Sequence, residues 1–333
     1  FTYAYTEMYA RNIDIEFDRQ KQWRGALNYN YSPNPSNITP FSNVSIFQND
    51  YLRLFRDFNF YYLPRSVTFR TSMNRGYAES LMRGKSAGLI VLEPNYVKSF
   101  DWDRMFDIRY DLTRSLRLQF NATTRARIDE PAGRMHPDDD DYQMKRDSIW
   151  QNIRDLGRTT FYTHRANLTY NLPLNRLPLV DFINANTSYV ADFDWVAAPR
   201  AAVDLGNTIE NSQSIRFNVN ANLVNFYNKV GFLQRINQQS GGGGRTSQRG
   251  GGPQPPGGPP DDDEERTDYA RVVLETALRM LMSGRNLSVN YTETSGTHMP
   301  GFTPTPDAFG QDWDLMAPGT GFLLGSQADI RGQ

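Results

Sequence analysis

The feature that most constrains this chain is a strict alternation of apolar and polar residues on both sides of a short turn. In 106–112 and 116–122 the apolar side chains occupy the even positions. The odd positions carry Asp107, Arg109, Asp111, Arg117, Gln119 and Asn121. A repeat of two residues places the two kinds of side chain on opposite faces of a β-strand. The three residues between the runs predict a hairpin with one face in water and the other against protein or lipid.

The same alternation recurs along the chain in twelve stretches, which we interpret as about ten strands. The predicted strand positions are 1–5, 13–17, 23–31, 58–62, 67–73, 106–112, 116–122, 164–172, 183–195, 213–228, 269–282 and 287–291. Several are as long as the roughly 9–11 residues that a tilted strand needs to cross a bilayer, whereas strands of soluble proteins are mostly shorter. We therefore predict an all-β fold, an antiparallel transmembrane β-barrel segment of a very large single-chain barrel.

Other stretches predict loops and a helix. Isoleucines and a leucine at helical spacing indicate one short amphipathic helix over 147–156, with Asp147 or Ser148 as its N-cap and Gly157 as its C-cap. Residues 50–56 suit a single helical turn, and 76–99 show no regular pattern. The Gly/Pro-rich, acidic stretch 238–266 cannot bury a core, so we predict a flexible insertion. It divides barrel strands and loops in 1–237 from further strands and a Gly/Pro-rich loop in 267–333.

Composition narrows the class of protein. The formal net charge of −1 gives no overall attraction to nucleic acid, and the absence of cysteine excludes disulfides and thiol chemistry. The chain is rich in Tyr and Phe although its mean hydropathy is −0.64. Aromatic residues suit strands and membrane interfaces. Both ends fall in mid-pattern, so we expect a piece of a longer polypeptide.

Loop lengths also favour a barrel over a soluble sandwich. Short turns at 113–115, 173–178 and 283–284 alternate with long excursions at 32–50, 127–158 and 197–212, as periplasmic turns alternate with outer loops in outer-membrane barrels. Strict alternation would place 238–266 on the periplasmic side. No second apolar layer is apparent in the sequence. We expect the apolar faces to contact lipid, and packing of those faces against a second layer of this chain would argue against a pore.

Individual side chains can be assigned on this basis. Side chains predicted to face an aqueous lumen are Arg70, Arg109, Arg117, Arg165 and Arg216, although any hydrated strand face can carry arginine. Side chains predicted to face lipid are Ile108, Tyr110, Leu118, Phe120, Leu168 and Tyr170.

Four stretches resemble one family. They are 57–75 (DFNFYYLPRSVTFRTSMNR), 126–134 (ARIDEPAGR), 205–211 with 223–230 (LGNTIEN and LVNFYNKV), and 317–327 (APGTGFLLGSQ). In their residues and in their order along the chain, they are similar to motifs of the SprA/Sov family, the outer-membrane translocon of the type IX secretion system. Thr320 stands where the family pattern has an aromatic residue, and 238–266 has no counterpart in it.

The resemblance implies a single-chain barrel in the outer membrane of a Gram-negative bacterium that exports folded proteins and is also linked to gliding motility. It implies secreted cargo proteins, a PorV-like barrel, a plug protein and periplasmic motor-associated components as partners, besides the lipid bilayer. It implies no enzyme activity, no cofactor and no nucleic acid. Two alternatives remain open at this point, a porin or nutrient-transporter barrel and a soluble β-rich adhesion module.

Few residues suggest chemistry. His136, His164 and His298 are scattered and lack the spacing of a zinc or catalytic site. Asp138–Asp141 with Asp129 and Glu130 could bind calcium, but an acidic loop in solvent is the better interpretation without the EF-hand spacing. The glycine runs 241–244 and 250–252 lack the context of a phosphate loop. The sequons at Asn121 and Asn167 reflect a polar strand face. We therefore predict no catalytic, cofactor or metal site.

Overall fold

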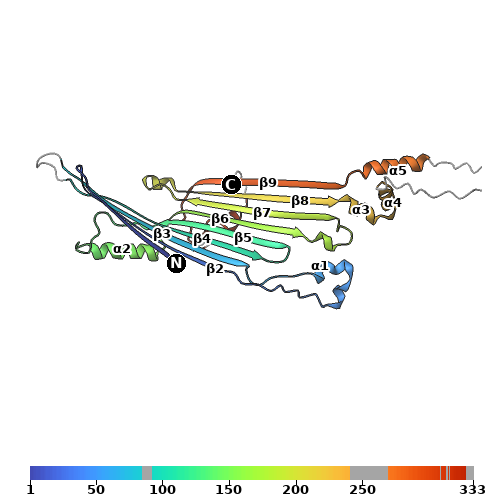
Figure 1. Cartoon of the computed structure of the whole chain (residues 1–333), viewed down its shortest axis with the longest axis horizontal. Coiled ribbons are helices and arrows are strands. Elements are labelled where there is room, and N and C mark those ends of the chain that lie inside the picture. The colour runs from blue at the N-terminus through green and yellow to red at the C-terminus, as the bar shows by residue number, and fades with distance from the viewer. Residues whose placement is uncertain (85–91, 241–268, 308, 313, 315, 328–333) are drawn as a thin grey trace, which may run out of the picture.

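One antiparallel sheet organises the protein. The computed structural model describes residues 1–84, 92–240, 269–307, 309–312, 314 and 316–327. Within them, nine strands pair in the order of the sequence, β1 to β9, each with its neighbour along the chain (Figure 1). The strands are β1 (Thr2–Ala10), β2 (Ile15–Tyr31), β3 (Ser66–Met82), β4 (Asn95–Asp111), β5 (Leu116–Arg127), β6 (Arg158–Leu172), β7 (Ile183–Val196), β8 (Asn207–Asn222) and β9 (Asn286–Phe302). The chain is an all-β protein, and β1 and β9 form the two edges of an open sheet.

Helices are confined to the connections. They are α1 (Arg53–Arg56), α2 (Tyr142–Arg154), α3 (Leu223–Lys229), α4 (Gly231–Ser240), α5 (Tyr269–Leu281) and α6 (Thr320–Leu323). Single 3-10 turns lie at Ser45–Gln48, Asp50–Leu52, Leu174–Arg176 and Arg200–Leu205. The predicted helical turn in 50–56 and the predicted hairpin of β4 and β5 are therefore confirmed.

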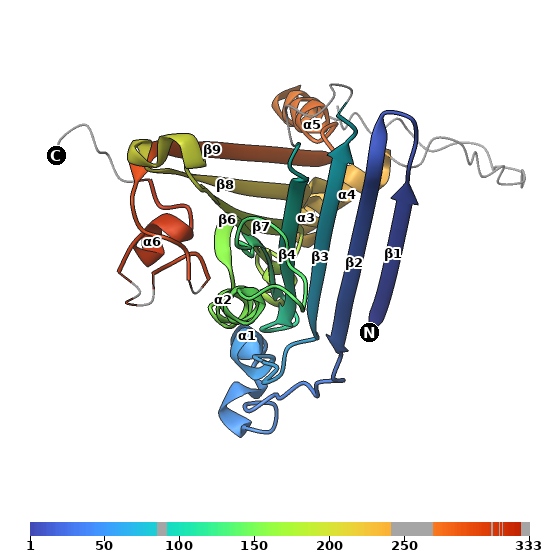
Figure 2. The same ribbon diagram turned by 90° about the vertical axis from the view of Figure 1, so that its left-hand side faces the viewer.

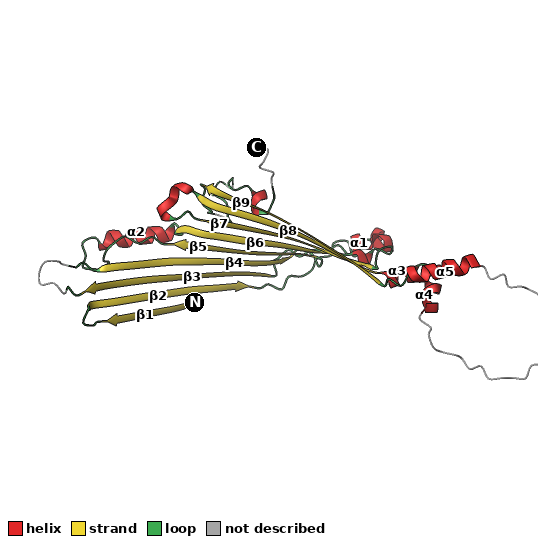
Figure 3. Ribbon diagram, turned by 90° about the horizontal axis from the view of Figure 1, so that it is seen from above, coloured by secondary structure: helices red, strands yellow, loops and turns green. Residues whose placement is uncertain are grey.

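The sheet has two distinct ends. The connections after β2, β4, β6 and β8 lie at one end, with α1, α3, α4 and α5, which we call the α1 end. The connections after β1, β3, β5 and β7 lie at the other, the α2 end (Figures 1 and 3). The predicted alternation of short and long connections fails at both ends. The long connections 32–65 and 223–285 share the α1 end with the short turns 112–115 and 173–182, and the short turn 11–14 lies at the α2 end.

Several predicted boundaries are wrong. In the strand predicted over 269–282, residues 269–281 form α5, and the strand predicted over 213–228 ends at Asn222, where α3 follows. In the stretch expected to be irregular, 76–99, residues 76–82 belong to β3 and 95–99 to β4, and 85–91 lie outside the described residues. Residues 58–62 are a loop with one isolated bridge, between Ile38 and Phe60. The helix predicted for 147–156 begins earlier, at Tyr142, so neither Asp147 nor Ser148 caps it.

Two segments of the same chain cover part of one face of the sheet. Beneath α2, the side chains of Phe100, Ile128 and Ile149 form a buried cluster. Beneath the segment 303–327, Tyr162, Phe193, Trp195 and Ile209 pack with Leu323 of α6. Figure 2 shows α2 and α6 on the same side of the sheet, within the angle between β1–β4 and β8–β9. The expectation that this face lacks a second layer is therefore wrong for its part near the α2 end.

Candidate functional site

The register of the strands sorts the side chains into two faces. Leu118 pairs with Tyr110 on β4 and with Leu168 on β6, so apolar residues continue across the sheet. Their neighbours continue the opposite face, since Gln119 pairs with Arg109 and with Asn167. We call these the apolar face and the polar face. Both extend over all nine strands, and they are the candidate functional surfaces of the described chain.

An apolar band crosses the first of these faces. It consists of Leu27, Tyr29, Tyr31, Val67, Phe69, Ile108, Tyr110, Leu118, Leu168, Tyr170, Ala185, Ile215, Phe217, Val219, Leu287, Val289 and Tyr291. Many of these are large and open to solvent, among them Tyr29, Tyr170, Phe217 and Tyr291. Contiguous exposed apolar surface marks a protein or membrane contact.

The apolar band runs obliquely to the strands. On β2 it centres on Tyr29, whose row of paired residues continues through Phe69, Phe106, Ala122, His164, Phe193, Asn211 and Thr297. On β9 it centres on Val289, which is 297 − 289 = 8 residues from Thr297. Eight residues span about 27 Å along a strand, and seven strand spacings from β2 to β9 span about 34 Å. The band is therefore inclined by about 40° to the direction perpendicular to the strands.

The polar face carries the five arginines predicted to line a lumen, Arg70, Arg109, Arg117, Arg165 and Arg216, all in its rows. Three lie near aspartates of the same face, at 3.5 Å for Arg109–Asp107, 3.9 Å for Arg117–Asp111 and 3.6 Å for Arg165–Asp192. These pairs are exposed, so each adds little stability. Together they leave the face strongly hydrated and close to neutral.

Asparagines form a row on the polar face near the α1 end. Asn171, Asn186, Asn218 and Asn290 pair in register across β6 to β9. Asn218 donates a hydrogen bond to Asn186 at 2.8 Å. This row lines a depression of about 750 Å³. Amides offer donors and acceptors without charge, so the row is hydrated and adds no charge of its own. Arg114 and Arg176 also line the depression.

The residues predicted to face lipid all lie on the apolar face. Ile108, Tyr110, Leu118 and Leu168 are half-buried, and Tyr170 is exposed. Phe120 differs from these five, because it packs against the cluster beneath 303–327, with its ring 6.3 Å from that of Phe309. Phe120 therefore lies where the covered part of the face meets the apolar band.

Paired charges hold the loop 128–141 to the apolar face. Arg75 of β3 makes two hydrogen bonds to Glu130, from Nε at 2.6 Å and from Nη2 at 2.9 Å. Lys98 of β4 donates to the carbonyl oxygen of Pro131 at 2.7 Å. Glu130 is almost fully buried, so the prediction of a solvated acidic loop is wrong for this residue. Arg75 and Glu130 both lie in stretches that resemble the SprA/Sov family, but the sequence does not show that they contact each other.

Asp129 joins three elements at the α2 end. It pairs with Arg158 at 2.9 Å and with Arg200 at 2.6 Å. Burial works against ionisation of this carboxyl, but the hydrogen bonds and positive charges of Arg158 and Arg200 outweigh it and hold the pKa of Asp129 below its usual value. Asp129 and Glu130 thus face different arginines and do not converge on one site.

Asn211 of β8 attaches the segment 303–327 to the sheet. Its Nδ2 donates to the carbonyl oxygens of Phe322 at 2.9 Å and Ser326 at 3.2 Å, and its Oδ1 accepts from Gln327 at 3.0 Å. His164 contacts the same segment, with Nε2 2.9 Å from the carbonyl oxygen of Leu323. His164 is thus a buried structural residue beneath α6. Asn211 ends the stretch 205–211 that resembles the SprA/Sov family, and no other sequence feature indicates this role.

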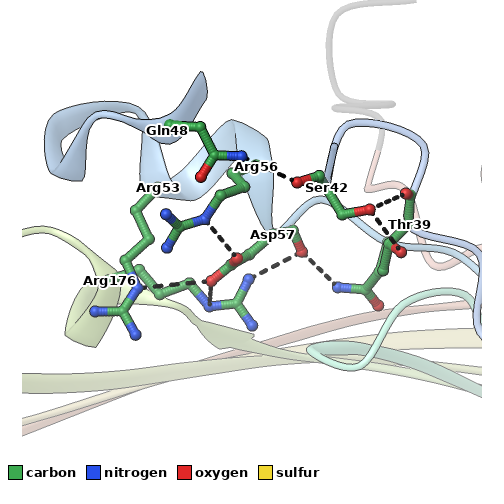
Figure 4. Close-up of polar contacts among 8 residues, drawn as sticks. Thr39, Ser42, Gln48, Arg53, Arg56, Asp57 and Arg176 are labelled. Carbon is green, nitrogen blue, oxygen red and sulfur yellow. Dashed lines mark hydrogen bonds and ion pairs between the residues drawn. The ribbon is translucent and has the colours of Figure 1, made fainter. Parts of the chain in front are cut away.

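The connection 32–65 is attached to the turn after β6. The carboxylate oxygens of Asp57 lie 3.5–3.7 Å from the Nε atoms of Arg53, Arg56 and Arg176 (Figure 4). Arg176 also donates to the carbonyl oxygen of Asp57 at 3.0 Å. A carboxylate shared by three guanidinium groups fixes this connection against the α1 end of the sheet.

The remaining candidates show no shared site. His136 lies beside Asp138 and His298 beside Glu210, far apart in the chain and on different elements. In the part of the chain that the structure describes, no three His, Cys, Asp or Glu side chains are grouped so as to hold a metal ion. Asn121 and Asn167 lie on the polar face. The glycine runs 241–244 and 250–252 and nearly all of 238–266 lie outside the described residues.

No described helix combines the length and apolarity needed to cross a membrane. Comparison with known sequences adds nothing to the geometry, since neither a family model nor a curated protein matches the chain. The fold and its surfaces define a class, an all-β protein built on one antiparallel sheet with an oblique apolar band on one face and a polar wall on the other.

Proposed function

We propose that this chain is part of a protein-conducting β-barrel of the bacterial outer membrane, of the kind that the SprA/Sov resemblance implies. One observation carries the proposal. The exposed apolar band is inclined by about 40° to the perpendicular of the strands, which matches the tilt of strands in transmembrane barrels, and the opposite face is polar along its length. A lipid belt outside and a hydrated wall inside would need this arrangement.

In this proposal the chain is a conduit and not an enzyme. The polar face, with its asparagine row and paired arginines, would line the lumen and leave passing proteins few apolar side chains to adhere to. Secreted cargo, a PorV-like barrel, a plug protein and periplasmic motor-associated components would be its partners, as the resemblance implies. The α1 end, which carries the short turns after β4 and β6, would face the periplasm. The insertion after β8 leaves the sheet at that same end.

A porin or nutrient transporter would use the same two faces. The proposal differs from it in the size of the complete barrel. The full-length strand count and the single-channel conductance would separate the two, because a lumen that passes folded proteins must conduct far more than a solute pore.

One observation favours a second candidate, a soluble β-rich binding module. Near the α2 end, α2 and the segment 303–327 bury the apolar face with side chains of the same chain. A soluble module would extend such cover over the whole face. The apolar band lies between these covering segments and the α1 end, and it includes the exposed Tyr29, Phe217 and Val289. This uncovered surface favours contact with lipid. Detergent-phase partition of the isolated protein would decide, since a soluble module stays in the aqueous phase.

The sharpest test uses two neighbouring positions of β5. Leu118 lies on the apolar face and Gln119 on the polar face. In the folded protein in lipid, Leu118→Arg should cost about 2–4 kcal/mol and Gln119→Arg almost nothing. A nitroxide at 118 should be relaxed by lipid-soluble oxygen and one at 119 by an aqueous reagent. A label at 118 seen only by the aqueous reagent would remove the proposal.

A further inference from the structure

A groove runs between α2 and the first strands of the sheet. Its volume is about 470 Å³, within the range of ligand sites. Tyr3, Trp23, Met73 and Phe100 of the apolar face line it from β1 to β4, and Ile149 and Trp150 line it from α2. Its lining is thus mainly aromatic and aliphatic.

The charges at this groove have one sign. Arg75 and Arg146 line it, and no carboxylate does. Arg75 is already paired with the buried Glu130. Among the residues that the structure describes, Asp147 is the only acidic neighbour of Arg146 within salt-bridge range, at 3.3 Å, and both side chains are open to solvent. Arg146 is therefore the positive charge that the groove offers to a ligand.

The helix beside the groove is firmly held and yet displays apolar side chains. Lys145 pairs with Asp141 at 2.7 Å and donates to the carbonyl oxygen of Arg134, and Asn152 donates to that of Asp129. Met144 is nevertheless 70% exposed, and Trp150, at the groove, is 55% exposed. Tryptophan beside arginine is the composition of a membrane interface.

The position of the groove indicates what occupies it. Trp23 and Gly25 continue the apolar band of β2, which begins at Leu27. Two residues beyond Trp23 the face becomes charged, with Lys21 opposite Glu7 on β1. On β2 the groove thus lies where the apolar residues meet the first charged one, the level at which acyl chains give way to headgroups.

We propose that this groove binds a membrane lipid with an anionic headgroup, an acyl chain lying on Trp23 and Met73 and the headgroup held by Arg146. The inference rests on the proposed function, because it needs the apolar band to lie in a bilayer. It adds a specific lipid site at the rim of that band, with α2 resting at the membrane surface.

The test uses the absence of cysteine from the sequence. A bimane label is placed at Met144→Cys, beside but outside the groove lining, or at Leu168→Cys in the apolar band, in the full chain in nanodiscs. The discs contain equal small fractions of brominated phosphatidylglycerol or brominated phosphatidylcholine. At 144 the anionic lipid should be enriched about fivefold over the zwitterionic one, the effect of one arginine. At 168 both should quench alike.

Two charge reversals on α2 complete the test. Arg146→Glu should abolish the preference at 144. Arg154→Glu, the same change on the same helix but outside the groove, should preserve it. Equal quenching at 144 by both lipids, or a preference that survives Arg146→Glu, overturns the lipid site while quenching at 168 upholds the barrel. Absence of quenching at 168 overturns both.

Discussion

Arg75 of β3 and Glu130 of the loop 128–141 form an ion pair that two hydrogen bonds hold together. The guanidinium of Arg75 also lies over two aromatic rings, 5.2 Å from the centre of Trp23 and 5.8 Å from that of Phe100. The pair therefore joins β3 to the loop before α2 and stands at the floor of the groove. One arginine both fixes the covering layer and shapes the surface beside it.

Removing the charge of Glu130 should release that layer. Glu130→Gln leaves the partly buried Arg75 without its counter-ion, and we expect a loss of about 2–4 kcal/mol, somewhat below the cost of breaking a fully buried pair. Amide hydrogen exchange over 128–154 should accelerate accordingly. Glu16→Gln, at an exposed position of β2, should leave exchange unchanged. Unaltered protection of α2 in the Glu130 variant would contradict this role of the pair.

Acid should loosen the α2 end through Asp129. Because Arg158 and Arg200 lower the pKa of Asp129 in the folded protein, its contribution to stability is fully present above the usual aspartate pKa near 3.9. It is lost as the pH falls through the lower folded value. Proteolysis of 128–157 by an acid protease should therefore rise steeply below about pH 4.

The control for acid loosening is Asp129→Asn, which removes the titrating group. This variant should be cut faster than the parent protein at pH 5 and should show a shallower change with pH. An identical pH profile in both proteins would show that other carboxyls govern the transition.

Asn211 should determine whether the segment 303–327 stays on the sheet. Asn211→Ala removes a donor from the carbonyl oxygens of Phe322 and Ser326, and a buried polar group left unpaired costs about 1–3 kcal/mol. We expect faster hydrogen exchange in 317–327 with little change in β4 and β5. Asn218→Ala, which breaks only an exposed bond to Asn186, serves as the control. Equal protection of 317–327 in both variants would remove Asn211 from this role.

The strands were predictable from the sequence where one face meets apolar surroundings and the other water. The hairpin of β4 and β5 has this alternation, and its positions and pairing follow from it. Toward the α2 end the apolar face carries Tyr77, Glu79 and Lys98 instead. Alternation disappears there, and the pairing of β3 with β4 continues by backbone hydrogen bonds and by contacts such as Lys98 with Tyr77. A two-residue repeat reflects different environments on the two faces of a strand and not the pairing of strands. The prediction of irregular structure for these residues is therefore wrong.

The helices and covering segments were harder to predict because their partners are distant in the sequence. Residues 269–281 carry leucines at 274, 278 and 281, a helical spacing. Leu278 packs near Tyr227 of α3. This contact is not visible in the local sequence pattern, which also suits a strand. In 58–62, Phe58 and Phe60 alternate because they join an aromatic cluster with Phe41, not because they pair in a sheet. Tertiary packing decides both cases.

The oblique course of the apolar band leads to a prediction about the depth of residues in the membrane, which the strand register alone would not give. If the band follows a bilayer, labels at Tyr29 on β2 and Val289 on β9 should lie at the same depth, although eight residues of register separate them (297 − 289). Thr297, which shares a row with Tyr29, should lie about 21 Å nearer the α2 end along the membrane normal, given a tilt of about 40°. Depth is measured from the ratio of relaxation by oxygen to relaxation by an aqueous nickel reagent, with one nitroxide per protein. Equal depths at 29 and 297 would mean upright strands, and the inferred tilt would then be wrong.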